Sequence, residues 1–170
     1  DWAPPDLVDT HLAFPFEGPN PKRMLRADAA HAIDLLSTGA ARNGVPIMGL
    51  SGFRSEQAQQ DLHAAYVGRE GLAAASTFSA KPGHSEHQTG LAIDVMATDQ
   101  GCPAEPCFAF TPQARWLAEH AHEYGFIVRY PQGKEDVTSY QAEPWHLRYV
   151  GVAAATEMAV LCQWVAATTC

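Results

Sequence analysis

The chain has 170 residues, 46% of them hydrophobic and 18% charged, a composition typical of one globular domain with a hydrophobic core. Its formal net charge is −8 with the histidines neutral. This acidic excess argues against nucleic-acid binding, which needs a basic surface, and against electrostatic adhesion to anionic membranes or wall polymers. We therefore expect a single domain over residues 1–170, in which any positive substrate pocket is built locally from individual arginines.

The first 21 residues are expected to form an extended arm. They contain five prolines, a residue that breaks helices and is confined to the edges of sheets. The segment 1–21 is therefore predicted to wrap around the domain with little regular structure.

Helix and strand patterns alternate irregularly along the rest of the chain. Ser55 is expected to cap one helix, and Thr111, followed by a proline, to cap another that Gly125 ends. This irregular order favours an α+β fold in which helices pack on a small, mostly antiparallel sheet. The expected helices cover residues 22–42, 55–67, 111–124 and 152–166, the strands 47–53, 90–95, 126–130 and 145–150, and the loops 68–82, 98–110 and 133–141.

Four cysteines fall into two pairs that are close in sequence. Four cysteines allow three pairings, of which we favour Cys102–Cys107 with Cys162–Cys170. Two such bridges would indicate an oxidising compartment, whereas reduced cysteines in a cytosolic protein are the alternative.

Three further features bear on where the protein acts. The sequence shows no signal peptide, so we expect a mature or trimmed form that is secreted, periplasmic or associated with the cell wall. The apolar stretch 151–169 contains Glu157 and Gln163 and is predicted to be an amphipathic or buried helix instead of a membrane span. We expect a monomer.

The most informative segment is Ser85–Asp94, which reads SEHQTGLAID. A buried aspartate is rare unless it is paired or bound to a metal, and Asp94 ends an otherwise apolar strand. In a strand, Ala92 and Asp94 share one face, while Ile93 and its apolar neighbours share the other. Asp94 is therefore predicted to point into a cleft while the apolar face packs into the core.

A second segment, Glu143–Tyr149, again places a histidine among apolar residues, with a carboxylate three positions before it. Together, His87, Asp94 and His146 offer two nitrogens and one oxygen, a set that suits a catalytic zinc ion with a fourth position open to water. Glu143 is then the natural general base. A lone histidine in an apolar strand, however, is more often a hydrogen-bonded structural residue than a metal ligand.

The chain resembles the zinc D-alanyl-D-alanine carboxypeptidases of the VanY type, which belong with the hedgehog-like zinc peptidases. The resemblance rests on three motifs in the family's order: Ser51–Ser55, Ser85–Asp94 and Glu143–His146. The opening Pro4–Val8 is similar too. One departure is Phe53, where tyrosine is common in the family. The resemblance spans most of the chain, from the arm to about residue 151.

This resemblance implies a role for each matching residue. His87, Asp94 and His146 would hold one zinc ion, and Glu143 would be the catalytic base. Zinc supports amide hydrolysis at neutral pH by lowering the pKa of its bound water to about 7.

Three more residues are implicated by the same resemblance. Arg54 matches an arginine that stabilises the substrate carbonyl and its developing negative charge, a catalytic and substrate-binding role. A cation at a helix N-terminus opposes the helix dipole, which hints independently at a function for Arg54. Gln59 and Ser85 match positions that hold the terminal D-residue and its carboxylate in related enzymes.

The expected function is release of a terminal D-alanine from the stem peptide of peptidoglycan by a D,D-carboxypeptidase. Alternatives within the family are an L,D-carboxypeptidase and a D,D-dipeptidase. A cell-wall endopeptidase shares the metal motif, although no repeat that would bind the wall is visible. A zinc-stabilised binding module without turnover is a further alternative, against which an intact Glu143 argues.

Overall fold

A four-stranded antiparallel sheet forms the centre of the computed structural model, which describes residues 2–99 and 101–168, with side chains up to residue 161. Every neighbouring pair in this sheet is antiparallel, as expected for the predicted α+β class. Its strand order is β3 (Ile47–Ser51), β4 (Ala92–Ala97), β6 (Glu143–Tyr149) and β5 (Phe126–Tyr130).

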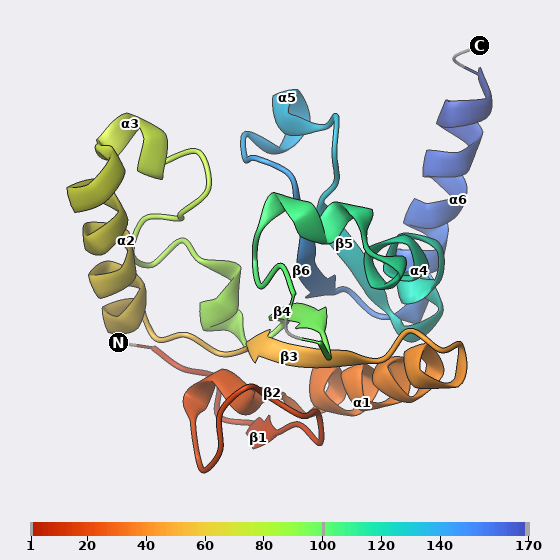
Figure 1. The fold of residues 1–170 in the computed structure, drawn as a ribbon, viewed down its shortest axis with the longest axis horizontal. Helices are drawn as coiled ribbons and strands as arrows, with labels where there is room; N and C mark the ends of the chain where they lie inside the picture. The colour runs from red at the N-terminus through yellow and green to blue at the C-terminus, as the bar shows by residue number, and fades with distance from the viewer. Residues whose placement is uncertain (1, 100, 169–170) are drawn as a thin grey trace.

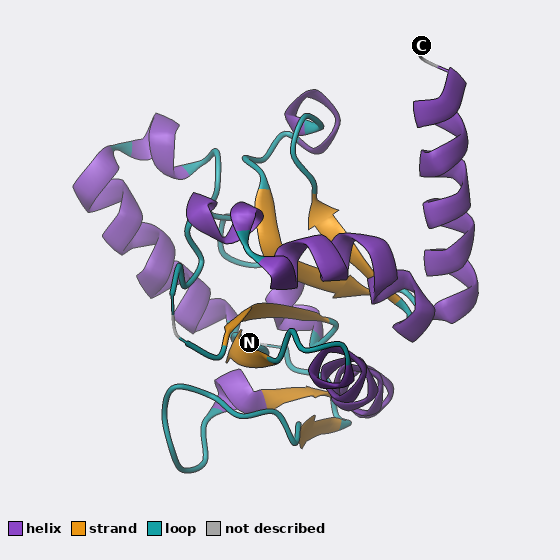
Figure 2. Cartoon of the chain, turned by 45° about the vertical axis from the view of Figure 1, so that its right-hand side comes forward, coloured by secondary structure: helices purple, strands orange, loops and turns teal. Residues whose placement is uncertain are grey.

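Helices surround this sheet on more than one side (Figures 1 and 2). In Figure 1, α2 and α3 lie at the left, whereas α1, α4 and α6 lie at the right. The helices are α1 (Ala27–Arg42), α2 (Glu56–Glu70), α3 (Leu72–Ala75), α4 (Pro112–His120), α5 (Glu135–Thr138) and α6 (Val152–Thr168), with 3₁₀ turns η1 (Pro21–Arg23), η2 (Glu86–Thr89), η3 (Pro106–Phe110) and η4 (Ala121–Tyr124).

The hydrophobic core lies on one face of β4 and β6. Ile93 and Leu147 face each other across these strands, and both are fully buried in the core. Ile33 of α1 and Leu117 of α4 pack into the same cluster. Asp94, on the opposite face of β4, lines a cleft, so the face alternation predicted from the sequence is confirmed.

The predicted helix ends are confirmed by their hydrogen bonds. The Ser55 hydroxyl accepts a hydrogen bond from the backbone N–H of Ala58 at the start of α2. Thr111 accepts in the same way from Ala114 at the start of α4. Gly125 closes η4 with φ of +83°, a left-handed conformation in which a side chain would be strained.

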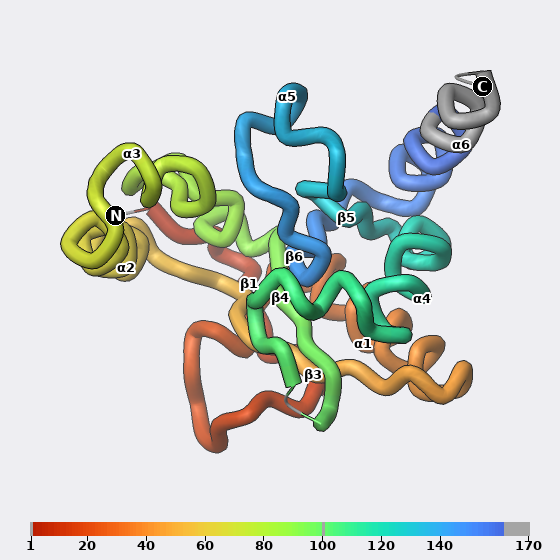
Figure 3. The backbone as a smooth tube through the Cα atoms, turned by 45° about the horizontal axis from the view of Figure 1, so that its top comes forward, coloured from red at the N-terminus to blue at the C-terminus, as the bar shows by residue number. Residues whose placement is uncertain are grey.

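The N-terminal region departs from the sequence expectation. The predicted helix 22–42 begins only at Ala27, because Met24–Arg26 form strand β2, which pairs with strand β1 (Leu7–Asp9). Helical periodicity is a local signal, whereas this pairing joins segments far apart in sequence, and a tertiary partner overrides local preference. The arm therefore contains a strand, and Figure 3 traces it in red from beside α2 toward the centre of the molecule.

Each of the three expected loops contains a short helical turn. These turns are α3 in 68–82, η3 in 98–110 and α5 in 133–141. The Cys102–Cys107 disulfide is present, as predicted, whereas the expected Cys162–Cys170 bridge lies outside the described residues. Within the described part of the chain, no helix has the length and apolar character needed to cross a membrane.

Candidate active site

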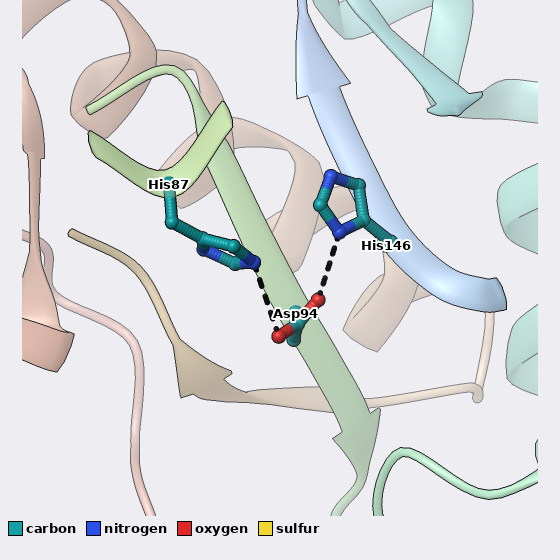
Figure 4. Close-up of side chains that lie close together, drawn as sticks. All are labelled: His87, Asp94 and His146. Atoms are coloured by element: carbon teal, nitrogen blue, oxygen red, sulfur yellow. Dashed lines mark ion pairs between the residues drawn. The ribbon is translucent and has the colours of Figure 1, made fainter. Parts of the chain in front are cut away.

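Two neighbouring strands and one turn bring the three predicted metal ligands together (Figure 4). The antiparallel register of β4 and β6 places Asp94 directly opposite His146, and η2, just before β4, carries His87. His87 Nε2 lies 3.3 Å from Asp94 Oδ2, and His146 Nδ1 lies 3.2 Å from Asp94 Oδ1. All three side chains are buried. We call this group the metal corner.

The geometry of the metal corner fits a zinc ion. One ligand atom from each residue lies within 4.8 Å of the other two. A tetrahedral zinc ion with ligands at about 2.0–2.2 Å places those ligands about 3.3–3.6 Å apart. In addition, Asp94 Oδ1 is buried and accepts no hydrogen bond from any described residue. Such an atom would be costly to bury unless a cation satisfied it.

The ring of His87 is oriented by the backbone of the Ser51–Ser55 motif. Its Nδ1–H donates to the carbonyl oxygen of Gly52 at 2.8 Å, which leaves Nε2 facing the metal corner. Gly52 is required there because a Cβ atom would lie 2.7 Å from the carbonyl oxygen of Met24. The glycine thus lets two backbone segments meet at the point where the histidine is held.

Charges in the metal corner shift the pKa values of its members. Burial alone would raise the pKa of Asp94, but the two histidines outweigh it and hold this pKa well below its usual range. Burial lowers the pKa of His87. For His146, burial acts in the same direction, but Asp94 and Glu86 prevail and raise the pKa to about 9. The site therefore attracts positive charge, which suits a cation.

Glu143 lies beside the metal corner in a position suited to proton transfer. It begins β6, and its Oε2 lies 3.6 Å from His146 Nδ1. Burial, reinforced by the charge of Asp94, raises the pKa of Glu143 to about 7. A carboxylate with a pKa near neutrality both accepts and returns a proton readily.

Arg54 reaches the same corner from the turn before α2. Its Nη2 lies 3.8 Å from Asp94 Oδ2 and donates to the Ser51 hydroxyl at 3.1 Å. Its Nη1 donates to Gln59 Oε1 at 2.9 Å. The guanidinium is thus fixed beside the metal corner, where it places a positive charge next to any group bound there.

A cleft of about 410 Å³ opens onto these residues. The metal corner, Arg54 and Glu143 all line it, and so do Gln59 and Ser85. Its outer walls, as we call them, are the cleft-lining residues of α2 and of the two loops 104–106 and 140–142. The cleft can therefore hold an extended small ligand against the metal corner.

Comparison with known proteins decides the family. The family model described as VanY, D-alanyl-D-alanine carboxypeptidase, matches residues 22–152 of the sequence. The chain belongs to the VanY family.

Individual VanY-type relatives support this assignment. The chain is 41% identical over 155 residues to the putative carboxypeptidase YodJ of Bacillus subtilis (strain 168), covering 91% of this chain and 57% of YodJ. Its fold is similar to that of the LdcB LD-carboxypeptidase, with a TM-score of 0.87 and 40% identity over 94% of this chain and 74% of that one. A VanY D,D-pentapeptidase variant in complex with Zn(II), from a VanB-type resistance cassette, gives a TM-score of 0.72 and 33% identity. The match covers 89% of this chain and 84% of that one. The chain spans about half the length of the curated relatives it matches.

Two further VanY-family positions, Gln59 and Ser85, line the cleft but are largely covered. Gln59 is only 2% exposed, and both ends of its amide are occupied: Oε1 by Arg54, and Nε2 by the carbonyl oxygen of Ala80 at 2.7 Å. Ser85 is 8% exposed. Their contact with a terminal D-residue stays a prediction.

One residue of this VanY-type site was missed from the sequence. Glu86 stands inside the quoted Ser85–Asp94 motif, and its carboxylate lies beside His146 and hydrogen-bonds to Arg129. Burial opposes ionisation here, but the contacts with His146 and Arg129 lower the pKa of Glu86 to about 2. The available signal was a charged residue next to a histidine that is predicted to bind the metal, but the partner of Glu86, Arg129, lies 43 positions away in sequence.

Proposed function

We propose that this chain is a zinc-dependent carboxypeptidase that releases the terminal D-alanine from the stem peptides of peptidoglycan. The observation that carries the proposal is the metal corner itself, which a general base and a guanidinium flank within one cleft. The zinc ion of the similar VanY D,D-pentapeptidase supports the choice of metal. One zinc ion would be held by His87, Asp94 and His146.

The residues divide the chemistry of amide hydrolysis between them. When bound, the zinc ion supplies Lewis-acid polarisation of the substrate carbonyl and of water. Glu143 takes a proton from the attacking water as the new C–O bond forms. It then passes this proton to the amine of the departing D-alanine as the C–N bond breaks. Arg54 stabilises the negative charge that develops on the carbonyl oxygen.

The first candidate specificity is D,D, for stem peptides that end in D-alanyl-D-alanine. The match to the D-alanyl-D-alanine carboxypeptidase family model supports it. The second candidate is L,D, because the similar LdcB LD-carboxypeptidase has a higher TM-score and a higher identity than the D,D-pentapeptidase. The two candidates share the metal corner and differ in the residue that precedes the scissile bond.

Cleavage of defined muropeptides by the zinc-loaded protein tests the proposal. A D,D-carboxypeptidase shortens a pentapeptide stem by one D-alanine, and an L,D-carboxypeptidase shortens a tetrapeptide stem by one D-alanine. Hydrolysis of free D-alanyl-D-alanine to two D-alanines would indicate a D,D-dipeptidase, and cleavage inside a cross-linked dimer would indicate an endopeptidase. Mass spectrometry separates these products. No product from any substrate, with zinc bound, would overturn the proposed function and favour a binding module.

The proposed place of action is outside the cytoplasmic membrane, in the periplasm or at the cell wall. The Cys102–Cys107 disulfide supports an oxidising compartment. The substrate supports the same location, since peptidoglycan stem peptides are exposed there. We further propose that residues 1–170 act as a single domain and as a monomer.

A further inference from the structure

The carboxylate of Glu86 lies behind His146, on the side of the ring that faces away from Asp94. Its Oε2 atom is 3.5 Å from His146 Nε2. Both atoms are buried, and neither forms a hydrogen bond with any other described residue. Two buried polar atoms without another hydrogen bond from the described residues thus face each other next to the metal corner.

The position of Asp94 explains why an acceptor is needed at that point. His146 presents Nδ1 to Asp94 and to the metal corner. A neutral imidazole that uses Nδ1 as a metal ligand carries its proton on Nε2, and this N–H requires an acceptor when it is buried. Glu86 Oε2 is the atom in position to accept it.

The two histidines of the metal corner are therefore supported differently. The Nδ1–H of His87 donates to an uncharged backbone carbonyl, that of Gly52. His146 faces a carboxylate instead, and a carboxylate partner makes a ligating imidazole a stronger electron donor.

Two arginines hold the Glu86 carboxylate in place. Arg129 of β5 donates from Nε to Glu86 Oε1 at 2.8 Å. Arg148 of β6 lies with Nη1 3.7 Å from Oε2, the oxygen that faces His146. The positive charges of these arginines offset the cost of burying Glu86 Oε2.

We propose that Glu86 is a positioning residue that fixes His146 as the Nε2–H tautomer, with Nδ1 directed at the zinc ion, and thereby tightens zinc binding. The inference rests on the proposed function for the identity of the metal. Beyond that function, it assigns a carboxylate–histidine–metal arrangement in which Arg129 and Arg148 hold the carboxylate of Glu86.

Zinc affinity is the direct test. Competition with a chromophoric chelator would be measured for the wild type, Glu86→Ala and Glu86→Gln. We expect zinc to bind about 10–100-fold more weakly to Glu86→Ala, and to Glu86→Gln with a smaller loss, since an amide oxygen still accepts a hydrogen bond. Affinity within twofold of the wild type in both variants would overturn the proposal.

Glu123→Gln is the matched control, because Glu123 also pairs with a histidine, His120, at 2.8 Å, but on the surface. Its zinc affinity should equal that of the wild type. If Glu86→Ala does not fold, the near-isosteric Glu86→Gln decides the outcome. Thermal unfolding of the metal-free proteins distinguishes the positioning role from a merely structural one. A merely structural role would lower the stability of the Glu86 variants and leave their zinc affinity unchanged.

Nitrogen-15 NMR of the histidine side chains gives a second readout. In the zinc-loaded wild type, His146 should carry its proton on Nε2 and bind zinc through Nδ1. Coordination through Nε2 would contradict the inference, whether or not the protein is active. Conversely, a wild type that binds zinc in this way and hydrolyses no stem peptide would contradict the proposed function and leave the role of Glu86 intact.

Discussion

The metal corner and the outer walls of the cleft are built on different kinds of structure. His87, Asp94 and His146 are buried, and two of them stand opposite each other on central strands of the sheet. Apart from the buried Gln59, the residues of the outer walls are exposed or half-buried. They come from one face of α2 and from two loops that contain or adjoin short helical turns. One of these loops is closed by the Cys102–Cys107 disulfide.

From this difference we infer that the metal corner carries out the proposed chemistry and that the outer walls select the substrate. The groups that we propose for hydrolysis are held by the strand register, by hydrogen bonds and by the core, so they tolerate little movement. The outer walls can change length or sequence without disturbing those groups, as is common for loops carried on a rigid scaffold. We therefore expect substitutions in the metal corner to abolish hydrolysis, and substitutions in the outer walls to alter which stem peptide is preferred.

The largest effect is expected from His87→Ala. It removes one of three metal ligands, so zinc affinity should fall by more than the roughly 10–100-fold that is typical of changes behind a ligand, and hydrolysis should fall with it. Zinc content after dialysis and the rate of D-alanine release measure the two effects. His84→Ala, in an exposed loop position of the same cleft, is the control and should keep its zinc. Full activity of His87→Ala would remove the proposed site.

The next largest effect is expected from Glu143→Ala. Loss of a general base lowers kcat by about 10²–10⁴-fold, whereas the three metal ligands remain. Zinc content should therefore stay at the wild-type level while D-alanine release nearly stops. A drop in zinc content would mean that Glu143 is a ligand and not a base.

A smaller effect, on stability, follows from the raised pKa of Glu143. Its pKa is about 7 in the folded, metal-free protein, compared with about 4.5 as the reference value. The folded state therefore holds this proton more tightly than the unfolded state. The resulting stabilisation is present below pH 4.5 and is lost as the pH rises through about 7.

Glu143→Gln cannot undergo this loss. Relative to the wild type, the metal-free variant should therefore gain stability between pH 5 and pH 8, by an amount on the order of 2 kcal/mol. Urea unfolding of both proteins at the two pH values measures the change. An unchanged difference in unfolding free energy would show that Glu143 ionises normally.

The smallest effect is expected in the outer walls. Tyr66 of α2 lines the cleft and packs edge-on against Phe78, with ring centroids 5.0 Å apart. Tyr66→Ala should change KM for a stem peptide by about 2–10-fold, an energy of at most about 1.4 kcal/mol, without changing zinc affinity. Tyr66→Phe, which keeps the ring, is the control. A large fall in kcat for Tyr66→Ala would show that the outer walls and the metal corner are not independent.

The sequence predicted the residues of the metal corner better than it predicted the distant contacts that hold them in place. The alternation around Asp94 and the caps at Ser55 and Thr111 are local patterns, and the structure confirms them. The contacts of Glu86 with Arg129 and of β1 with β2 join distant segments, which periodicity does not report. The burial of Gln59, and the hydrogen bond of its amide to Ala80, likewise depend on tertiary packing that the sequence pattern does not report.

The pairing of Asp94 with His146 also has a consequence for folding. Side chains on a strand alternate between two faces, so a slip of β6 by one position along β4 would turn the imidazole inward and bring Leu147 out into the cleft. Mispaired chains would then bury a polar ring among Ile93 and its apolar neighbours, at a cost of several kcal/mol. The residues proposed to bind the metal thus disfavour wrong strand alignment even in the metal-free chain, and the correctly aligned sheet is the one that brings Asp94 and His146 together.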